Sequence, residues 1–193
     1  MKTTRPYCKR CRYPQNTCVC FAISKIHTSI QISILQDPSE TKHPKNTARL
    51  LPLLLSEAHI YTGHFPCDFE RVRQRVSLSQ NNLVLFPNAN AVSLNEESDA
   101  VDCDHLILLD GSWRKAKKLW FNNPWLHDLP SVALVDCESS EYFIRATRNT
   151  NSLSTLEAAS LILSNVENIP RAPFVSILNA MQSHWQRHAS RKD

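Results

Sequence analysis

Four short apolar segments constrain the fold of this chain more than any other feature. They lie at residues 30–36, 82–86, 105–109 and 131–136, and polar or turn-forming residues bound each of them. The third segment, His105–Leu109, is continuously hydrophobic beyond its first residue, which is typical of a strand covered on both faces. Strands of this kind need helices on both sides of their sheet. The pattern therefore predicts an α/β domain with a mainly parallel sheet flanked by helices.

Helical signals occur between and after these segments. Residues 47–57 are rich in leucine and contain a proline that must start, kink or split a helix. A capping box, Ser-Thr-Leu-Glu, predicts a helix over residues 154–166. Apolar residues then recur at helical spacing over 174–185 and predict a last helix. Residues 88–99 are polar, and we expect them to form a surface connection.

The chain contains only two glycines, Gly63 and Gly111. A dinucleotide-binding fingerprint needs three glycines, and a P-loop needs two at a fixed spacing before a lysine. Neither of these phosphate-binding loops can be built from this sequence. Any nucleotide-like ligand must therefore be held in another way.

Four of the seven cysteines are close together near the N-terminus: Cys8, Cys11, Cys18 and Cys20. In a reducing compartment, a CxxC followed by a CxC favours a metal site over disulfides, although free thiols or a redox pair are alternatives. Four thiolates complete the tetrahedral shell of a structural zinc ion and leave no open position for catalysis. We therefore predict a zinc knuckle over residues 1–27 and a main domain over 28–193. The other cysteines are expected to be small core residues, namely Cys67, Cys103 and Cys137.

The third predicted strand ends in Asp110-Gly111-Ser112-Trp113. In open α/β sheets, ligands bind at the carboxyl ends of the strands. Gly111 permits a tight turn or a close approach to a ligand. Asp110 can accept a proton or a hydrogen bond, and Trp113 offers a stacking surface. The alternative is structural, with the aspartate capping a helix and the tryptophan in the core.

A strongly basic segment, residues 114–121, follows this turn and predicts an amphipathic helix. Its polar face carries four cations: Arg114, Lys115, Lys117 and Lys118. No acidic residue is near them in the sequence, although the net charge of the whole chain is only +4. A basic face is often only solvated, but phosphate binding is its natural use. Together with Arg145 and Arg148, which lie close to two aromatic residues, it favours nucleic acid as the partner.

Five ordered blocks carry a resemblance to a known family. The first is Asp110–Trp113 with the following Arg-Lys-Ala, which is similar to an Asp-x-Thr-Trp signature. The others are Arg5-Pro6 with the four cysteines, residues 37–51, residues 85–87, and residues 142–145 with 153–158. Together they resemble the DTW-domain family, the tRNA-uridine aminocarboxypropyltransferases. The chain departs from the family pattern at Ser112, at Asp37 and in the Asn-Ala-Asn that follows Pro87.

The resemblance implies a SPOUT-like fold with a C-terminal trefoil knot, in which residues 28–193 are the catalytic domain. It implies transfer of the 3-amino-3-carboxypropyl group from S-adenosylmethionine to the ring imide nitrogen of a tRNA uridine, with release of methylthioadenosine. Among knotted loops, the donor would be held without a glycine-rich loop. The residues predicted to bind the donor are Leu85, Pro87, Leu109, Gly111, Ser112, Trp113, Leu153, Ser154 and Thr155.

Within this resemblance, Asp110 is predicted to be the catalytic base that removes the imide proton. Trp113 stacks either on the donor's adenine or on the target uridine. Ser154 either binds the donor or only caps its helix. Either Arg49 or Arg145 pairs with the donor's carboxylate, and the alternative for Arg49 is an ion pair with Glu40 or Glu57. The cations predicted to bind tRNA phosphates are Arg49, Arg114, Lys115, Lys117, Lys118, Arg145 and Arg148.

Two alternative functions remain open from the sequence: a SPOUT-type RNA methyltransferase, and a non-catalytic zinc-bearing RNA-binding protein. The longest apolar stretch, residues 50–55, is far shorter than the roughly 18 residues that a bilayer span needs. No apolar secretory segment follows the N-terminus. We therefore expect a cytoplasmic protein whose partner is tRNA, without membrane association and without an obligate protein partner.

Overall fold

The computed structural model describes residues 6–95, 101–135, 140–144 and 153–189 of the chain. Its central sheet has the strand order β2-β1-β5-β3-β6-β4, and all five strand pairs are parallel. The strands are β1 (Gln31–Gln36), β2 (Ala58–Thr62), β3 (Asn82–Leu85), β4 (Val92–Leu94), β5 (His105–Asp110) and β6 (Ser131–Leu134). The predicted α/β class with a parallel sheet is confirmed.

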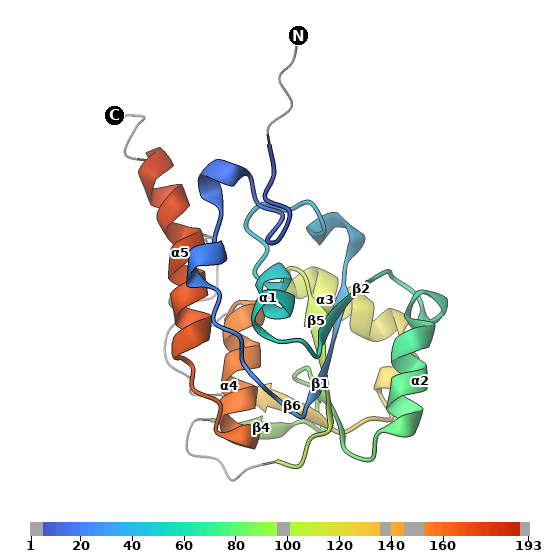
Figure 1. Ribbon diagram of the computed structural model, residues 1–193. Coiled ribbons are helices and arrows are strands. Elements are labelled where there is room, and N and C mark those ends of the chain that lie inside the picture. Colours follow the sequence, from blue (N-terminus) through green and yellow to red (C-terminus); the bar gives the residue numbers. More distant parts are fainter. Residues whose placement is uncertain (1–5, 96–100, 136–139, 145–152, 190–193) are drawn as a thin grey trace.

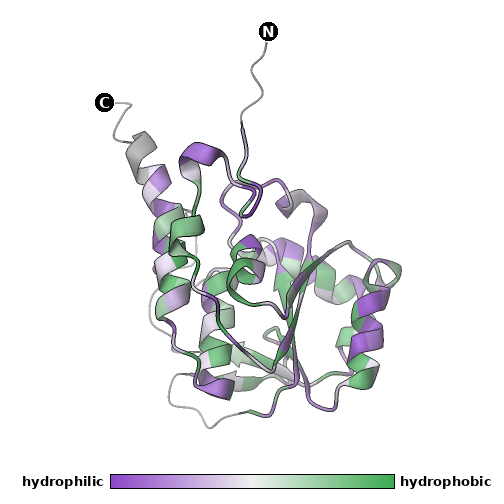
Figure 2. Ribbon diagram, viewed as in Figure 1, coloured by the Kyte–Doolittle hydropathy of each residue, from purple (hydrophilic) through white to green (hydrophobic). Residues whose placement is uncertain are grey.

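Helices cover both faces of this sheet (Figure 1). They are α1 (Leu51–Leu54), α2 (Glu70–Leu78), α3 (Trp113–Asn122), α4 (Thr155–Glu167) and α5 (Ala172–Ala189). The larger hydrophobic core joins α1, α4 and α5 to one face, and the smaller core joins α2 and α3 to the other. Figure 2 shows hydrophobic residues concentrated in the strands and hydrophilic residues along α2.

Alternation along β5 produces these two cores. Leu106 and Leu108 pack into the larger core, whereas Ile107 packs into the smaller one. Successive side chains of a strand point to opposite faces, so a strand at the centre of a two-sided sheet must be apolar at every position. Burial on both faces of the sheet therefore explains the uninterrupted hydrophobic run from which this strand was predicted.

Two strands and two helices differ from the sequence prediction, which did not include α2. β2 and β4 were not expected, and β4 lies within residues 88–99, which are therefore only partly a surface connection. Both are edge strands with several exposed or half-exposed positions, so their hydrophobic pattern is weak. Within residues 47–57 the helix is a short one, α1, and its proline occupies the first turn, where no backbone N–H is needed.

The buried side chain of His105 on β5 connects this strand to its two neighbours, β1 and β3. The Nε2 atom of His105 lies 2.8 Å from the Ser33 hydroxyl on β1, and its Nδ1 atom lies 3.0 Å from the Asn82 side-chain oxygen on β3. Burial lowers the pKa of His105 to about 4, and the positive charge of Arg75 acts in the same direction. The ring is therefore neutral at pH 7 and satisfies two polar neighbours that have no access to water.

The N-terminal knuckle packs against the main body of the protein. Cys11, Tyr13 and Val19 are buried in the larger core, and the Tyr13 hydroxyl donates to the Met181 sulfur of α5 at 3.2 Å. The domain boundary at residue 27 stays a prediction. The trefoil knot also stays a prediction, because the connection between β6 and α4 includes residues outside the described ranges. Among the described helices, none combines the length and apolarity that a membrane crossing requires.

Candidate active site

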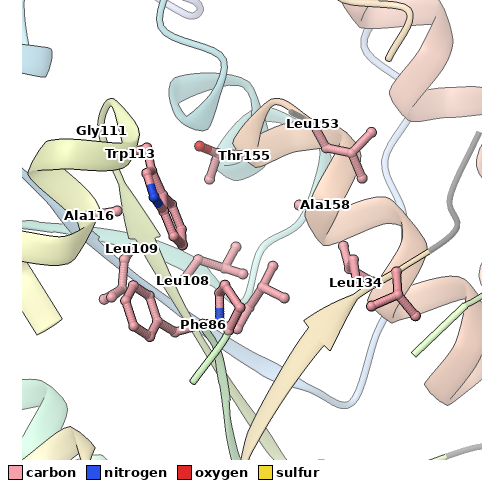
Figure 3. A pocket seen from close by; sticks show the side chains of 13 residues that line it. Phe86, Leu108, Leu109, Gly111, Trp113, Ala116, Leu134, Leu153, Thr155 and Ala158 are labelled. Carbon is pink, nitrogen blue, oxygen red and sulfur yellow. The ribbon is translucent and has the colours of Figure 1, made fainter. Parts of the chain in front are cut away.

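A pocket of about 520 Å³ opens at the carboxyl ends of β3, β5 and β6, between α3 and α4. This volume is in the range of small-molecule sites. Trp113 of α3 and Leu153, just before α4, lie on opposite sides of it (Figure 3). The lining residues are Leu85, Phe86, Pro87, Leu108, Leu109, Gly111, Trp113, Ala116, Leu134, Val135, Leu153, Thr155 and Ala158.

Most of the residues predicted to bind the donor line this single pocket, although they come from three distant parts of the sequence. These residues are Leu85, Pro87, Leu109, Gly111, Trp113, Leu153 and Thr155. Ser112 and Ser154 are not among the lining residues. They occupy the N-cap positions of α3 and α4, and of the two only Ser154 makes a side-chain capping hydrogen bond. The Ser154 hydroxyl accepts a hydrogen bond from the backbone of Glu157, whose carboxylate accepts one from the backbone of Ser154, so the predicted capping box is confirmed.

Sequence reasoning missed the other residues of the lining. Leu134 is the last residue of β6 and Val135 follows it, both near the end of the predicted strand 131–136, and the rule that ligands gather at strand ends would have found them. Phe86 lies inside the block that carried the family resemblance. Ala116 and Ala158 gave no signal, because small residues on a helix become part of a pocket only when another element faces them.

Trp113 is held in place by a stack of aromatic rings. Its ring lies 5.5 Å from that of Phe86, which lies 4.5 Å from that of Trp120, and both pairs are nearly parallel. His127 packs on the far side of this group, 4.5 Å from Trp120. Trp113 is nevertheless 48% exposed. It therefore presents a fixed aromatic surface to the pocket.

Asp110 is at the end of β5 but does not line the pocket, and only 3% of its surface is exposed. Three side chains donate hydrogen bonds to its carboxylate. Gln36 and Asn46 donate to Oδ2 at 2.8 and 2.7 Å, and Thr155 donates to Oδ1 at 2.7 Å. The aspartate thus joins the ends of β1 and β5 to the first turn of α4. Neither Gln36 nor Asn46 was among the predicted site residues, although Asn46 belongs to the block of residues 37–51.

The pKa of Asp110 is raised by burial, against the three hydrogen bonds that favour its charged form. The negative charge of Glu40 adds to the increase. Thr155 is the connection between this carboxylate and the pocket, because its hydroxyl donates to Asp110 while its side chain lines the cavity. A proton leaving a ligand in the pocket would therefore meet the threonine hydroxyl before the carboxylate.

The fold places an acid beside the basic helix, contrary to the expectation that none is near. The Lys115 ammonium lies 2.8 Å from the carboxylate of Glu40, whose side chain has no exposed surface, whereas the Lys115 side chain is 29% exposed. Gly111 makes room for this lysine, because a Cβ at position 111 would lie 2.8 Å from the Cβ of Lys115. Lys115 is therefore engaged in an ion pair.

The other three cations of α3 are exposed, and Ala116, Leu119 and Trp120 are buried, as the amphipathic pattern predicts. Lys117 lies beside the pocket, with its ammonium 5.2 Å from the centre of the Trp113 ring. Arg49 is elsewhere: its guanidinium lies 4.1 Å from the centre of the Tyr13 ring, and it donates to the backbone oxygen of Arg12. Arg145 and Arg148 lie outside the described residues.

The four N-terminal cysteines converge on one point. Their sulfur atoms all lie within 4.8 Å of one another, with Cys8 and Cys20 at 3.6 Å and Cys11 and Cys18 at 3.7 Å. Zinc–sulfur bonds of about 2.3 Å in a tetrahedron place sulfur atoms about 3.8 Å apart, so the group fits a zinc ion. Backbone N–H groups of Cys11 and Arg10 lower the pKa of Cys8 to about 6, which favours its thiolate form.

The prediction that the remaining three cysteines are core residues is confirmed for one of them and wrong for another. Cys103 is buried, as predicted for a small core residue, but Cys67 is exposed, and that prediction is wrong. Cys67 lies in a short 3-10 helix just before α2, with its apolar neighbour Phe69 turned inward in its place. Cys137 lies outside the described residues.

Comparison with known proteins gives a consistent result. Residues 5–186 match the DTW domain family. The chain is 34% identical over 172 residues to tRNA-uridine aminocarboxypropyltransferase 2 of Drosophila melanogaster, covering 86% of this chain and 68% of that protein. It is 30% identical over 195 residues to the protein of that name from Macaca fascicularis, covering 96% of this chain and 65% of the relative. The chain thus spans about two thirds of the length of these relatives.

No solved structure matches the chain at a significant level. The family match covers nearly the whole sequence, including the four cysteines, the turn at Asp110 and the pocket-lining segments. The chain therefore belongs to the DTW-domain family.

Proposed function

We propose that this protein is an enzyme that transfers the 3-amino-3-carboxypropyl group of S-adenosylmethionine to the ring imide nitrogen of a uridine in tRNA, releasing methylthioadenosine. The names of its relatives support this activity. The observation that carries the proposal is the pocket at the carboxyl ends of β3, β5 and β6, where one hydroxyl, that of Thr155, leads to the buried carboxylate of Asp110.

The pocket suits the donor because the described side chains that line it carry no charge and include one large exposed ring. A sulfonium cation is stabilised next to an aromatic face, and the leucine side chains offer apolar contact to an adenosine. Trp113 is either the surface for the donor or the stacking partner of the target uridine. Three carbon atoms of a sulfonium can be attacked, so the choice of the aminocarboxypropyl carbon comes from placing the acceptor nitrogen in line with that carbon–sulfur bond.

The reaction requires removal of one proton. The uridine nitrogen forms a bond to the donor carbon while the carbon–sulfur bond breaks, and its electron pair stays on the sulfur of methylthioadenosine. We assign the imide proton to the Thr155 hydroxyl, which passes its own proton to Oδ1 of Asp110. The raised pKa of this carboxyl supports the role, because it makes Asp110 a stronger proton acceptor than an ordinary aspartate.

The exposed cations of α3 border the pocket and are proposed to hold the RNA. Arg114, Lys117 and Lys118 are exposed, and phosphate contacts from such residues position a nucleic acid without selecting its sequence. Lys115 contributes less to this surface, because Glu40 already neutralises it. The four cysteines would hold a structural zinc ion, which gives the small N-terminal knuckle a rigid centre.

The test is incubation of the purified protein with S-adenosylmethionine and an unmodified tRNA transcript, followed by mass analysis of the nucleosides. The expected products are an aminocarboxypropyl-uridine and methylthioadenosine. Formation of S-adenosylhomocysteine would instead identify an RNA methyltransferase, and binding of tRNA without either product would favour a non-catalytic RNA-binding protein.

A matched pair of variants tests the proton path. Thr155→Val removes the hydroxyl at nearly constant shape, and the turnover number should fall by about 10²-fold or more, as is typical of lost general-base catalysis. Thr155→Ser keeps the hydroxyl and should retain most of the rate. Equal rates for the two variants would contradict the path through Thr155.

A further inference from the structure

A second pocket, of about 350 Å³, includes Arg49 in its lining and has no role in the proposed chemistry. The N-terminal knuckle, the loop before α1 and the C-terminal half of α5 form it, and Figure 1 shows the knuckle beside α5. Its lining residues are Tyr7, Arg12, Tyr13, Pro14, Thr17, Lys42, Pro44, Arg49, Met181, His184 and Trp185.

The chemistry of this knuckle pocket combines cations with aromatic rings. Arg12, Lys42 and Arg49 line it together with Tyr7 and Trp185, and none of the described side chains in the lining is acidic. Tyr7 is 60% exposed. Aromatic faces bind nucleobases by stacking, and arginine and lysine bind phosphates.

Arg49 is fixed in a position suited to ligand binding. Its guanidinium lies over the ring of Tyr13, and one of its nitrogen atoms donates to the backbone oxygen of Arg12 at 3.1 Å. A guanidinium held in this way loses little side-chain freedom when it binds a phosphate.

Arg12 provides an independent observation. Its backbone has φ of +59°, in the left-handed region that glycine and asparagine adopt most easily. It is at the turn that closes the Cys8–Cys11 loop, where its N–H donates to the Cys8 carbonyl. A glycine would meet the backbone requirement at lower cost, so the presence of a long cation at a strained position indicates a use for its side chain.

From these observations we propose that the knuckle pocket binds one nucleotide of the substrate RNA, with its base against Tyr7 or Trp185 and its phosphate on Arg12 and Arg49. This inference rests on the proposed function only in naming tRNA as the RNA. Asn46 connects the two sites, because it accepts a hydrogen bond from the Arg49 backbone and donates one to Asp110. The 46–49 segment thus contacts both the knuckle pocket, through Arg49, and the carboxylate of Asp110, through Asn46.

The test compares Arg12→Gly with Arg71→Ala, which removes one exposed positive charge from α2. Arg12→Gly relieves the backbone strain, so its melting temperature should equal or exceed that of the wild type. Its affinity for a labelled, unmodified tRNA should fall about tenfold, the size expected for one charge-assisted hydrogen bond. The slope of log affinity against log salt should decrease by about 0.7–0.9. Arg71→Ala should change neither quantity by a comparable amount.

Further measurements separate the outcomes. Trp185→Leu should also weaken tRNA binding, and both variants should bind S-adenosylmethionine like the wild type. The proposal is overturned if Arg12→Gly and Trp185→Leu bind tRNA no more weakly than Arg71→Ala. It is also overturned if free AMP binds tightly and competes at these residues while tRNA affinity is unchanged, because the pocket would then take a free nucleotide. Binding is measured without turnover, so failure of the proposed transfer reaction would not affect this result.

Discussion

The ion pair between Lys115 and Glu40 allows a quantitative prediction about stability. The Glu40 side chain is completely buried, and the ammonium of Lys115 lies 2.8 Å from its carboxylate. Removing one partner of a buried pair leaves an uncompensated charge, which costs about 3–5 kcal/mol when both groups are inaccessible to water. Lys115 is 29% exposed, so water screens part of the interaction and we expect Lys115→Met to lose about 2–3 kcal/mol.

The measurement is urea unfolding followed by tryptophan fluorescence, with Lys117→Met as the control on the same helix. Lys117 is exposed, so its replacement should change the free energy of unfolding by less than about 0.5 kcal/mol. For a chain of this length, a loss of 2–3 kcal/mol corresponds to a decrease of about 5–10 °C in melting temperature. The double variant Glu40→Gln/Lys115→Met should recover a large part of the loss, because no buried charge remains.

The reasoning is refuted if Lys115→Met and Lys117→Met lose the same stability, or if the double variant is no more stable than Lys115→Met alone. Either result would mean that the Glu40 carboxylate does not depend on the lysine. Lys115 would then be available to the RNA in the same way as its neighbours on α3.

Two further predictions concern protonation and metal. The pKa of His105 is lowered from 6.5 to about 4, so its contribution to stability is complete above pH 6.5 and is lost as the pH falls toward 4. Between pH 7 and pH 5 the wild type should lose about 2 kcal/mol more than His105→Gln in urea titrations, and identical pH profiles would exclude this role. Purified protein should contain one zinc ion per chain by atomic absorption. A strong chelator should lower its melting temperature by roughly 5–10 °C, because the knuckle shares its core with α5; an unchanged melting temperature would contradict a structural metal.

The sequence predicted the parts of the fold in which local pattern and tertiary role agree. The apolar run at 105–109 became the central strand, because a strand with helices on both faces must be hydrophobic on both. The capping box at Ser154 formed as expected, since it depends on residues three positions apart. Edge strand β4 was missed, because a short strand with exposed positions leaves almost no pattern.

The residues of the candidate site also fall into those that local sequence reveals and those that only the fold brings together. The turn at Asp110 and the basic residues after it could be recognised from sequence because they are contiguous. Glu40, Gln36 and Asn46 could not, because each meets its partner only through the folding of segments far apart in the chain.

The amino-acid sequence by itself therefore determined the parallel α/β architecture, the four-cysteine cluster, the basic helix and the segment that bears Asp110. Only the tertiary structure decided that this aspartate is buried behind Thr155, that one of the four helix cations is paired with Glu40, and that the knuckle forms a cationic pocket with α5. The physical reason is that hydrophobic periodicity and capping act over a few residues. Burial, ion pairing and cavity formation depend instead on which distant side chains come into contact when the sheet and its helices assemble.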